Sequence, residues 1–250
     1  MRFSLQQFTT ALDLRDAQGK PYVIIGGQAV GYWAETYLEQ EPELVRWLPF
    51  NSKDIDFQGD RADVLRIAKD LRARAQLPDS REMTSLAGVI PLAIGGARTS
   101  IEVVRLFPGI PQERIQQWAL TASRGGKEIR VLDPLSLLTC KLRLALKVDQ
   151  RERRDVEHLR IMLLCVRAFL RETLRGVEAG SLPTRGWLGA VERVLKLAES
   201  SLGKKAARTL GVDWTQALPL VDIAASGHRT AKRFRETRLV QWQAKLRRLA

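Results

Sequence analysis

The hydrophobic and polar positions in the first half of the chain follow two different periodicities. Five short apolar runs predict buried or half-buried strands, at residues 22–26, 54–57, 87–94, 100–106 and 128–132. Apolar residues recur at helical spacing in two further stretches, residues 28–38 and 62–75. Strands that alternate with helices in this way predict an α/β (α+β) domain over residues 1–132.

A diglycine marks a turn within this domain. Gly95-Gly96 separates the runs at residues 87–94 and 100–106, so these two runs are expected to pair as a hairpin. Pro91 lies inside the first run and cannot donate a backbone hydrogen bond to a neighbouring strand. That run is therefore expected to be an edge strand or to contain a bulge.

The pattern changes at Asp133-Pro134. Aspartate at the N-cap with proline at the first helical position is a common helix start. An apolar stripe that includes Leu135, Leu138 and Leu142 follows, and a second long helix is expected over residues 152–174. Shorter helical stretches continue to the end, without a comparable strand signal after residue 132. The chain thus predicts an all-helical domain over residues 133–250.

Composition indicates a globular, cytoplasmic protein. Hydrophobic residues make up 45% of the 250 positions, enough for a real core. Cys140 and Cys165 lie in apolar helical surroundings without a CxxC spacing, so buried, reduced thiols are expected. No apolar run approaches the roughly 18–20 residues needed to span a bilayer, and the first residues lack the apolar core of a signal peptide. We therefore expect no membrane span.

The charge is strongly positive. The chain has 41 Lys and Arg against 28 Asp and Glu, a net charge of +13. Such an excess favours polyanionic partners, with nucleic acid foremost, although a nucleotide alone or simple solubility are alternatives. Residues 229–248 are especially basic, and Leu239, Trp242, Leu246 and Leu249 fall on one helical face. The basic face of this helix is expected either to follow an RNA backbone or to be a solvated surface.

Candidate chemistry is concentrated at two short segments. The strand at residues 22–26 runs into Gly26-Gly27, and a glycine turn lets a phosphate approach the backbone closely. Asp54 and Asp56 are two positions apart on a strand, so they point the same way while Ile55 points into the core. Mg²⁺ is commonly held by one or two carboxylates together with substrate phosphates. These segments indicate metal-assisted chemistry on a nucleotide.

Glu102 supplies a third carboxylate. It lies in the apolar, β-branched run at residues 100–106, where a buried, unpaired charge is costly. If this strand lies beside Asp54 and Asp56, the three acids converge and can hold two metal ions about 4 Å apart. The alternative is a charge that keeps an edge strand soluble.

The chain resembles the nucleotidyltransferase fold of the DNA polymerase β superfamily, and within it the AbiEii-like toxins and their bacterial relatives. The resemblance spans about residues 20–165. The residues that carry it are Gly26-Gly27-Gln28-Ala29, Ser52-Lys53-Asp54-Ile55-Asp56-Phe57, Lys141 and Arg154-Asp155-Val156-Glu157-His158-Leu159. It implies a nucleotidyltransferase-like mixed sheet with flanking helices, followed by the helical domain. It also implies Mg²⁺-dependent transfer of a nucleoside monophosphate from an NTP to a hydroxyl group.

The resemblance further implies roles for individual residues. Gly26 and Gly27 would line the triphosphate, and Ser52 and Lys53 would touch phosphate. Asp54 and Asp56 would bind Mg²⁺. Glu102 would be either a third metal ligand or the base for the acceptor hydroxyl. Lys141 would approach the nucleotide from the helical domain, with Asp155 near the cleft.

The partners implied are an NTP, RNA or tRNA as the acceptor and, for a toxin-like activity, an antitoxin protein. Two alternatives remain open. The first is the same fold acting on a small molecule or a protein side chain, and the second is a non-catalytic module that binds nucleotide or nucleic acid. The chain departs from the family in the 26 residues that separate Gly27 from Asp54, which predict either an insertion or a longer helix-loop over residues 32–51.

Overall fold

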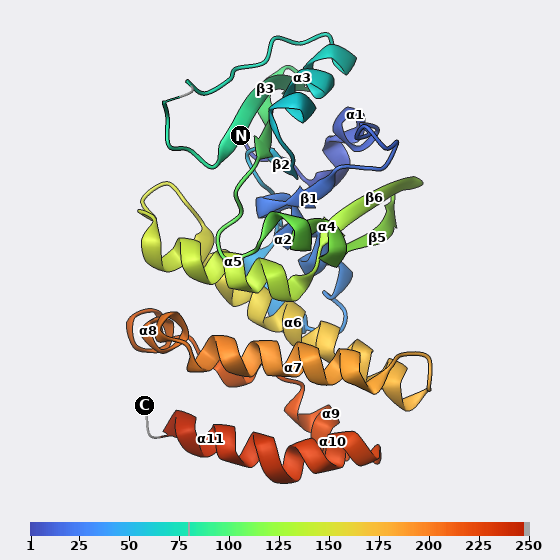
Figure 1. The fold of residues 1–250 in the computed structure, drawn as a ribbon, viewed down its shortest axis with the longest axis vertical. Helices are drawn as coiled ribbons and strands as arrows, with labels where there is room; N and C mark the ends of the chain where they lie inside the picture. The colour runs from blue at the N-terminus through green and yellow to red at the C-terminus, as the bar shows by residue number, and fades with distance from the viewer. Residues whose placement is uncertain (80, 248–250) are drawn as a thin grey trace. The chain divides into compact units, whose positions relative to one another are not determined.

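The structure is a computed structural model that describes residues 1–79 and 81–247. The chain forms two compact units (Figure 1). The first contains Met1–Thr36 and Val45–Cys140, and the second contains Tyr37–Leu44 and the chain from Lys141 onward. Each unit is described separately below.

The first unit is built on a six-stranded sheet with the strand order β3-β4-β2-β1-β6-β5. The strands are β1 (Val23–Ile25), β2 (Ile55–Gln58), β3 (Leu86–Ile94), β4 (Ala97–Val104), β5 (Ala119–Arg124) and β6 (Lys127–Leu132). The pairs β1–β6 and β2–β4 are parallel, whereas β1–β2, β3–β4 and β5–β6 are antiparallel. The expected mixed sheet is therefore confirmed.

Helices flank this sheet. They are α1 (Thr9–Leu12), α2 (Gly26–Thr36), α3 (Arg61–Asp70), α4 (Gln112–Trp118) and the start of α5 (Pro134–Lys147). The unit also contains the 3-10 turn η1 (Leu5–Gln7) and the last three residues of the 3-10 turn η2 (Pro42–Trp47). Ile55, Phe57, Ile101 and Val103 are buried, as the alternation of strand side chains predicts. The α/β character of this region is confirmed.

Both ends of the sheet are hairpins. β3 and β4 are joined through Gly95-Gly96, and β3, which contains Pro91, is an edge strand with a register irregularity near Gly88. These features were expected. β5 was not expected, although Gly125-Gly126 joins it to β6. The sequence of β5 carries a weak apolar signal because an edge strand with exposed positions needs few apolar residues.

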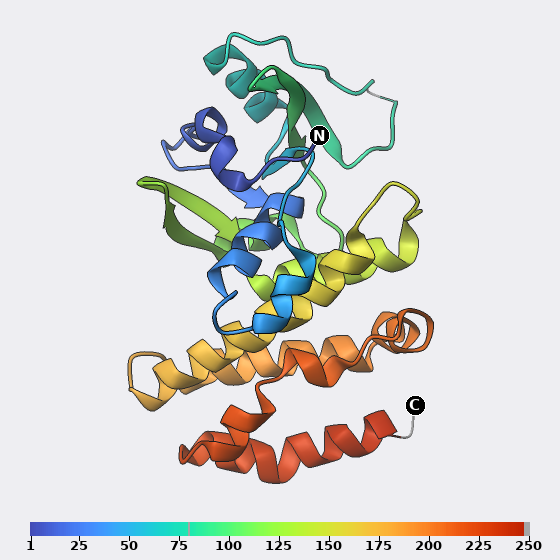
Figure 2. The ribbon, with the colours of Figure 1, turned by 180° about the vertical axis from the view of Figure 1, so that it is seen from behind.

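The second unit is helical. Its helices are α6 (Asp155–Glu178), α7 (Thr184–Glu199), α8 (Ser201–Leu210), α9 (Leu220–Ala225), α10 (Arg229–Phe234) and α11 (Val240–Arg247), with a 3-10 turn η3 (Trp214–Ala217) and a π-helical turn η4 (Arg235–Leu239). Figure 2 shows them from behind. Residues 133–247 contain no strand, which confirms the expected helical region. Cys140 and Cys165 are both buried, as expected. No helix among the described residues is long and apolar enough to cross a membrane.

The two units meet in the sequence at a different place from the expected boundary between residues 132 and 133. α5 does begin there, because Oδ1 of Asp133 accepts hydrogen bonds from the backbone of Leu135 and Ser136, each at 3.1 Å. The division falls inside α5, between Cys140 and Lys141. A continuous helix at the junction carries no local sequence signal of a boundary.

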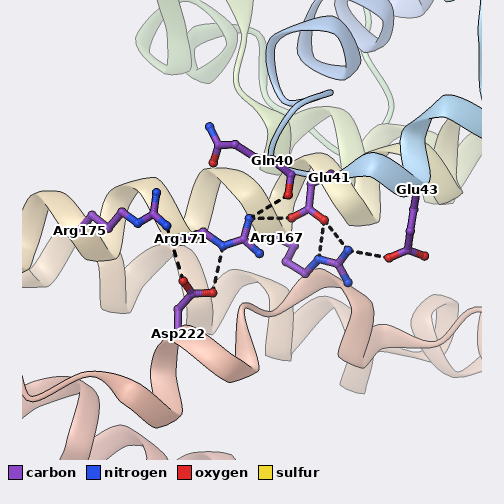
Figure 3. Close-up of polar contacts among 7 residues, drawn as sticks. All are labelled: Gln40, Glu41, Glu43, Arg167, Arg171, Arg175 and Asp222. Carbon is purple, nitrogen blue, oxygen red and sulfur yellow. Dashed lines mark hydrogen bonds and ion pairs between the residues drawn. The ribbon is translucent and has the colours of Figure 1, made fainter.

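The insertion also crosses the expected boundary, since residues 37–44 belong to the second unit. The hydroxyl of Tyr37 donates to Glu172 on α6 at 3.0 Å. Glu41, 2% exposed, accepts hydrogen bonds from Arg167 and Arg171, also on α6 (Figure 3). The long gap between the diglycine and the acids thus supplies a segment of the helical unit.

Candidate active site

Gly26 and Asp56 are in close contact. β1 ends at Ile25, which pairs with Asp56 on β2, and α2 begins at the next residue. Gly26 has φ +66°, and a Cβ atom there would lie 1.8 Å from Oδ2 of Asp56. Only glycine fits, both because L-residues avoid this φ and because the carboxylate occupies the space of a side chain. The diglycine and the Asp-x-Asp segment are therefore parts of one site.

Glu102 lies beside Asp56. The parallel pairing of β2 with β4 places these two residues in register, on strands about 4.8 Å apart. Their neighbours Ile101 and Val103 are fully buried, so the two acids face the other side of the sheet and are half-buried. The register therefore shows that the strand of Glu102 lies beside the strand of Asp56, as expected.

Asp54 immediately precedes β2, in a segment that is held on both sides. The hydroxyl of Ser52 donates to Oδ1 of Asp54 at 3.3 Å, and the backbone of Ser52 exchanges two hydrogen bonds with Phe3. The carbonyl of Lys53 accepts from the Thr99 hydroxyl on β4 at 2.6 Å, while the Lys53 side chain is exposed. These contacts position Asp54 next to β4.

Gln28 supports the same segment from α2. Its side chain is buried, and its Nε2 donates to the carbonyl of Phe3 at 3.0 Å. Phe3 in turn pairs with Ser52, so Gln28 links the first turn of α2 to the residues before Asp54. The sequence offers no motif that would have identified Phe3, because its role depends on a pairing over 49 positions.

The donor chemistry of the three acids fits a hard cation such as Mg²⁺, which prefers oxygen ligands. Within residues 1–79 and 81–247, however, no group of three or more His, Cys, Asp and Glu side chains is arranged to hold a metal ion. Mg²⁺ needs only one or two carboxylates when phosphates and water complete its shell. Asp56 and Glu102 lie in register, and Asp54 directly precedes β2.

Lys141 and Asp155 belong to the second unit, where they bind each other. Nζ of Lys141 lies 2.9 Å from Oδ1 of Asp155, and Nε of Arg153 donates to Oδ2 at 2.6 Å. Both members of the pair are buried. Burial raises the pKa of Asp155, but the charges of Lys141 and Arg153 outweigh it and hold this pKa below its ordinary value. The pair joins α5 to α6, and its nucleotide-binding role stays a prediction.

The positive charge of the chain gathers in the second unit. This unit contains 24 Lys and Arg and 14 Asp and Glu, a difference of +10 of the total +13. Arg238 forms ion pairs with Glu192 and Glu199 on α7, so part of the expected basic helix is neutralised. Exposed cations of α8, α10 and α11 include Lys205, Arg208, Arg229, Lys232, Arg233 and Lys245. Leu239 and Trp242 are buried as expected, whereas the Leu246 side chain and Leu249 lie outside the described residues.

The chain was compared with protein families, curated proteins and solved structures. No family model matches the chain, and no curated protein matches it. A crystal structure of an antigenic nucleotidyltransferase-like protein from Paracoccidioides brasiliensis is similar to this structure, with a TM-score of 0.44 and 14% sequence identity. The match covers 65% of this chain and 78% of that chain. The function of this chain has to follow from its own residues.

Proposed function

We propose that the first unit is a Mg²⁺-dependent nucleotidyltransferase that transfers a nucleoside monophosphate from an NTP to a hydroxyl group. The observation that carries this proposal is the contact of Gly26 with the carboxylate of Asp56, which is itself in register with Glu102. A phosphate-accommodating turn and paired carboxylates at one point of a sheet are what phosphoryl chemistry requires.

The glycines and the start of α2 would receive the triphosphate. The first N–H groups of an α-helix have no acceptor within the helix, and they bear the positive end of its dipole. α2 begins at Gly26, so these groups open beside Asp56. Exposed Lys53, one residue before Asp54, would add positive charge for a phosphate.

The carboxylates would hold the metal and accept a proton. When bound, Mg²⁺ would neutralise phosphate charge. The acceptor oxygen would bond to the α-phosphorus, and the bond to pyrophosphate would break. Asp54 and Asp56 are assigned as metal ligands. Glu102 is assigned as either the third ligand or the base that takes the proton of the acceptor hydroxyl.

RNA is the proposed acceptor. Its support is the net charge of +10 on the second unit and the exposed cations of α8 and α10, which suit a polyphosphate backbone. A toxin-like activity, with a protein antitoxin as partner, stays a prediction that follows from the resemblance alone.

The test is incubation with labelled NTPs, Mg²⁺ and total RNA, followed by separation of RNA, protein and small molecules. We expect label in RNA with the wild type and none with an Asp54→Asn/Asp56→Asn variant. Asp70→Asn is the matched control, because Asp70 is an exposed aspartate at the end of α3.

Each outcome of this assay has a defined meaning. Equal labelling by wild type and the double variant would refute the assigned site. Label in the protein or small-molecule fraction would refute RNA as the acceptor and leave the transferase in place. No incorporation and no pyrophosphate release would favour a non-catalytic binding module and refute the proposal.

A further inference from the structure

The β3–β4 hairpin extends the sheet beside the candidate active site. Ile101 and Val103 on β4 are fully buried, so the alternate positions of this strand face the other side of the sheet. Those positions include Arg98, Ser100 and Glu102. Arg98 is exposed, whereas Ser100 and Glu102 are half-buried. Arg98 and Ser100 therefore share a face with the third acid of the site.

β2 continues this face on one side. The hydrogen bond from the Thr99 hydroxyl to the carbonyl of Lys53 carries the parallel pairing of β2 with β4 back to the residues before β2. Asp54 thus lies beside Ser100, two positions before the acids that are in register. The polar face of β4 is therefore directly continuous with the Asp-x-Asp segment.

β3 continues the same face on the other side. The antiparallel pairing places Pro91 opposite Ser100 and Ala93 opposite Arg98. Opposed residues of paired strands share a face, and both Pro91 and Ala93 are exposed. We call Pro91, Ala93, Arg98 and Ser100 the β3–β4 strip. Arg98 carries its only charge, and the other three side chains are small.

Arg98 differs from the other cations of the strands. Those are Arg124, Lys127 and Arg130, and each is bound by a side chain or carbonyl of the protein. The side chain of Arg98 makes no hydrogen bond or ion pair with any residue in 1–79 or 81–247. A guanidinium is weakly hydrated and matches phosphate oxygens with two N–H donors. Arg98 is therefore the strand cation that is available to a phosphate.

The geometry of the proposed transfer places the acceptor on the same side of the acids as this strip. The attacking and leaving oxygens lie roughly in line across the phosphorus. The triphosphate is proposed to lie at Gly26 and Gly27, which follow β1, so pyrophosphate leaves on the β1 side. In the strand order β3-β4-β2-β1, the acids lie between that turn and β3. The attacking hydroxyl therefore arrives from the side of β4 and β3.

We propose that the β3–β4 strip binds the acceptor RNA strand and that Arg98 holds one of its phosphates. Arg98 lies four positions before Glu102, about 13 Å along β4, so it binds the RNA chain next to the reacting nucleotide. The Ser100 hydroxyl, between these two residues, would donate to the same RNA backbone. The direction of the strand rests on the proposed function, whereas RNA binding by the strip does not require NTP or Mg²⁺.

The test is fluorescence anisotropy of a labelled, short single-stranded RNA oligonucleotide, titrated with the full chain at several salt concentrations without NTP or Mg²⁺. We expect Arg98→Gln to weaken RNA binding about three- to tenfold and to reduce the salt slope by about 0.7, the contribution of one phosphate contact on a single strand. Arg98→Lys keeps the charge and should restore the slope. Ala93→Glu places a carboxylate opposite Arg98 and should weaken binding at least as much as Arg98→Gln.

Arg61→Gln is the matched control. It removes the same charge from an exposed arginine of the same unit, at the start of α3 and thus beyond the other end of β2 from Asp54. It should change neither the affinity for RNA nor the salt slope. All of these variants replace exposed side chains, so they report on binding rather than on folding.

Two results would overturn the proposal. The first is a salt slope and an affinity for RNA that Arg98→Gln changes no more than Arg61→Gln does. The second is a loss of NTP binding in Arg98→Gln, measured by calorimetric titration with Mg²⁺, together with unchanged RNA binding, because Arg98 would then contact the triphosphate.

This proposal and the transferase activity fail separately. The anisotropy measurement contains no NTP, so absence of nucleotidyl transfer leaves its result intact. If transfer to RNA is observed, Arg98→Gln should raise the KM for RNA about three- to tenfold and leave the KM for NTP unchanged. An unchanged KM for RNA in this variant would overturn the role of Arg98 and leave the transferase in place.

Discussion

Glu41 provides the sharpest stability prediction, because a buried carboxylate holds the insertion on α6. Glu41 is 2% exposed, and its Oε2 accepts from Nε of Arg167 at 2.9 Å while Oε1 lies 3.0 Å from Nη1 of Arg171 (Figure 3). Glu41→Gln keeps the shape of the side chain but leaves two guanidinium groups without this counter-charge.

The expected cost follows from what each arginine retains. Removing one partner of a buried ion pair costs about 3–5 kcal/mol. Arg167 still has Glu43 at 2.9 Å, and Arg171 still has Asp222 at 2.9 Å. We therefore expect Glu41→Gln to lower the free energy of unfolding of the helical unit by about 2–4 kcal/mol.

The matched control is Glu43→Gln. Its carboxylate contacts the same Arg167, but its side chain is 46% exposed, so its ion pair contributes about 0–1 kcal/mol. The measurement is hydrogen exchange of the α6 amides, which reports on the second unit alone, together with urea denaturation. Equal losses for the two variants would refute the reasoning, because burial would then have no effect on the value of the pair.

Three other predictions can be checked with single substitutions. Gly26→Ala should displace the Asp56 carboxylate and destabilise the first unit by about 1–3 kcal/mol. Gly95→Ala should cost less, because Gly95 has a similar positive φ but a Cβ atom there would meet nothing within 4 Å. Equal urea midpoints for the two variants would contradict this. The pKa of Asp155 is lowered by its cationic partners, although burial opposes this, so its stabilisation is complete above the ordinary value of 3.8 and is lost as the pH falls through the lower folded value. The stability gap between wild type and Asp155→Asn should accordingly stay constant near neutral pH and shrink in acid, and a gap that widens there would contradict the assignment. Burial raises the pKa of Tyr22 to about 12, so phenolate absorbance that is lost in Tyr22→Phe should appear near pH 12 rather than near 10.

Much of the fold was accessible from local patterns. The strand and helix periodicities, the Gly95-Gly96 hairpin and the Asp133 cap all depend on residues that are close in sequence. β5 was missed because an edge strand needs little apolar character. The two compact units divide inside α5, where a continuous helix carries no local boundary signal.

The candidate site was only partly accessible. Residue types and spacing indicated Gly26, Asp54, Asp56 and Glu102, but not their contacts. The prediction for Glu102 assumed that its strand lies beside the strand of Asp56. The parallel register of the two strands shows that it does. Lys141 and Asp155 were predicted near a nucleotide, whereas the contact that the structure shows is between the two of them.

The sequence by itself determined the alternating strands and helices, the helical second half, the buried cysteines and the residue types of the candidate site. These follow from side-chain periodicity and from the intrinsic chemistry of glycine and carboxylates, which act over a few residues. Only the tertiary structure decided that Asp56 lies against Gly26 and that residues 37–44 join the helical unit. Each of these depends on pairings between distant segments, and their free energy comes from burial and contacts that no local pattern records.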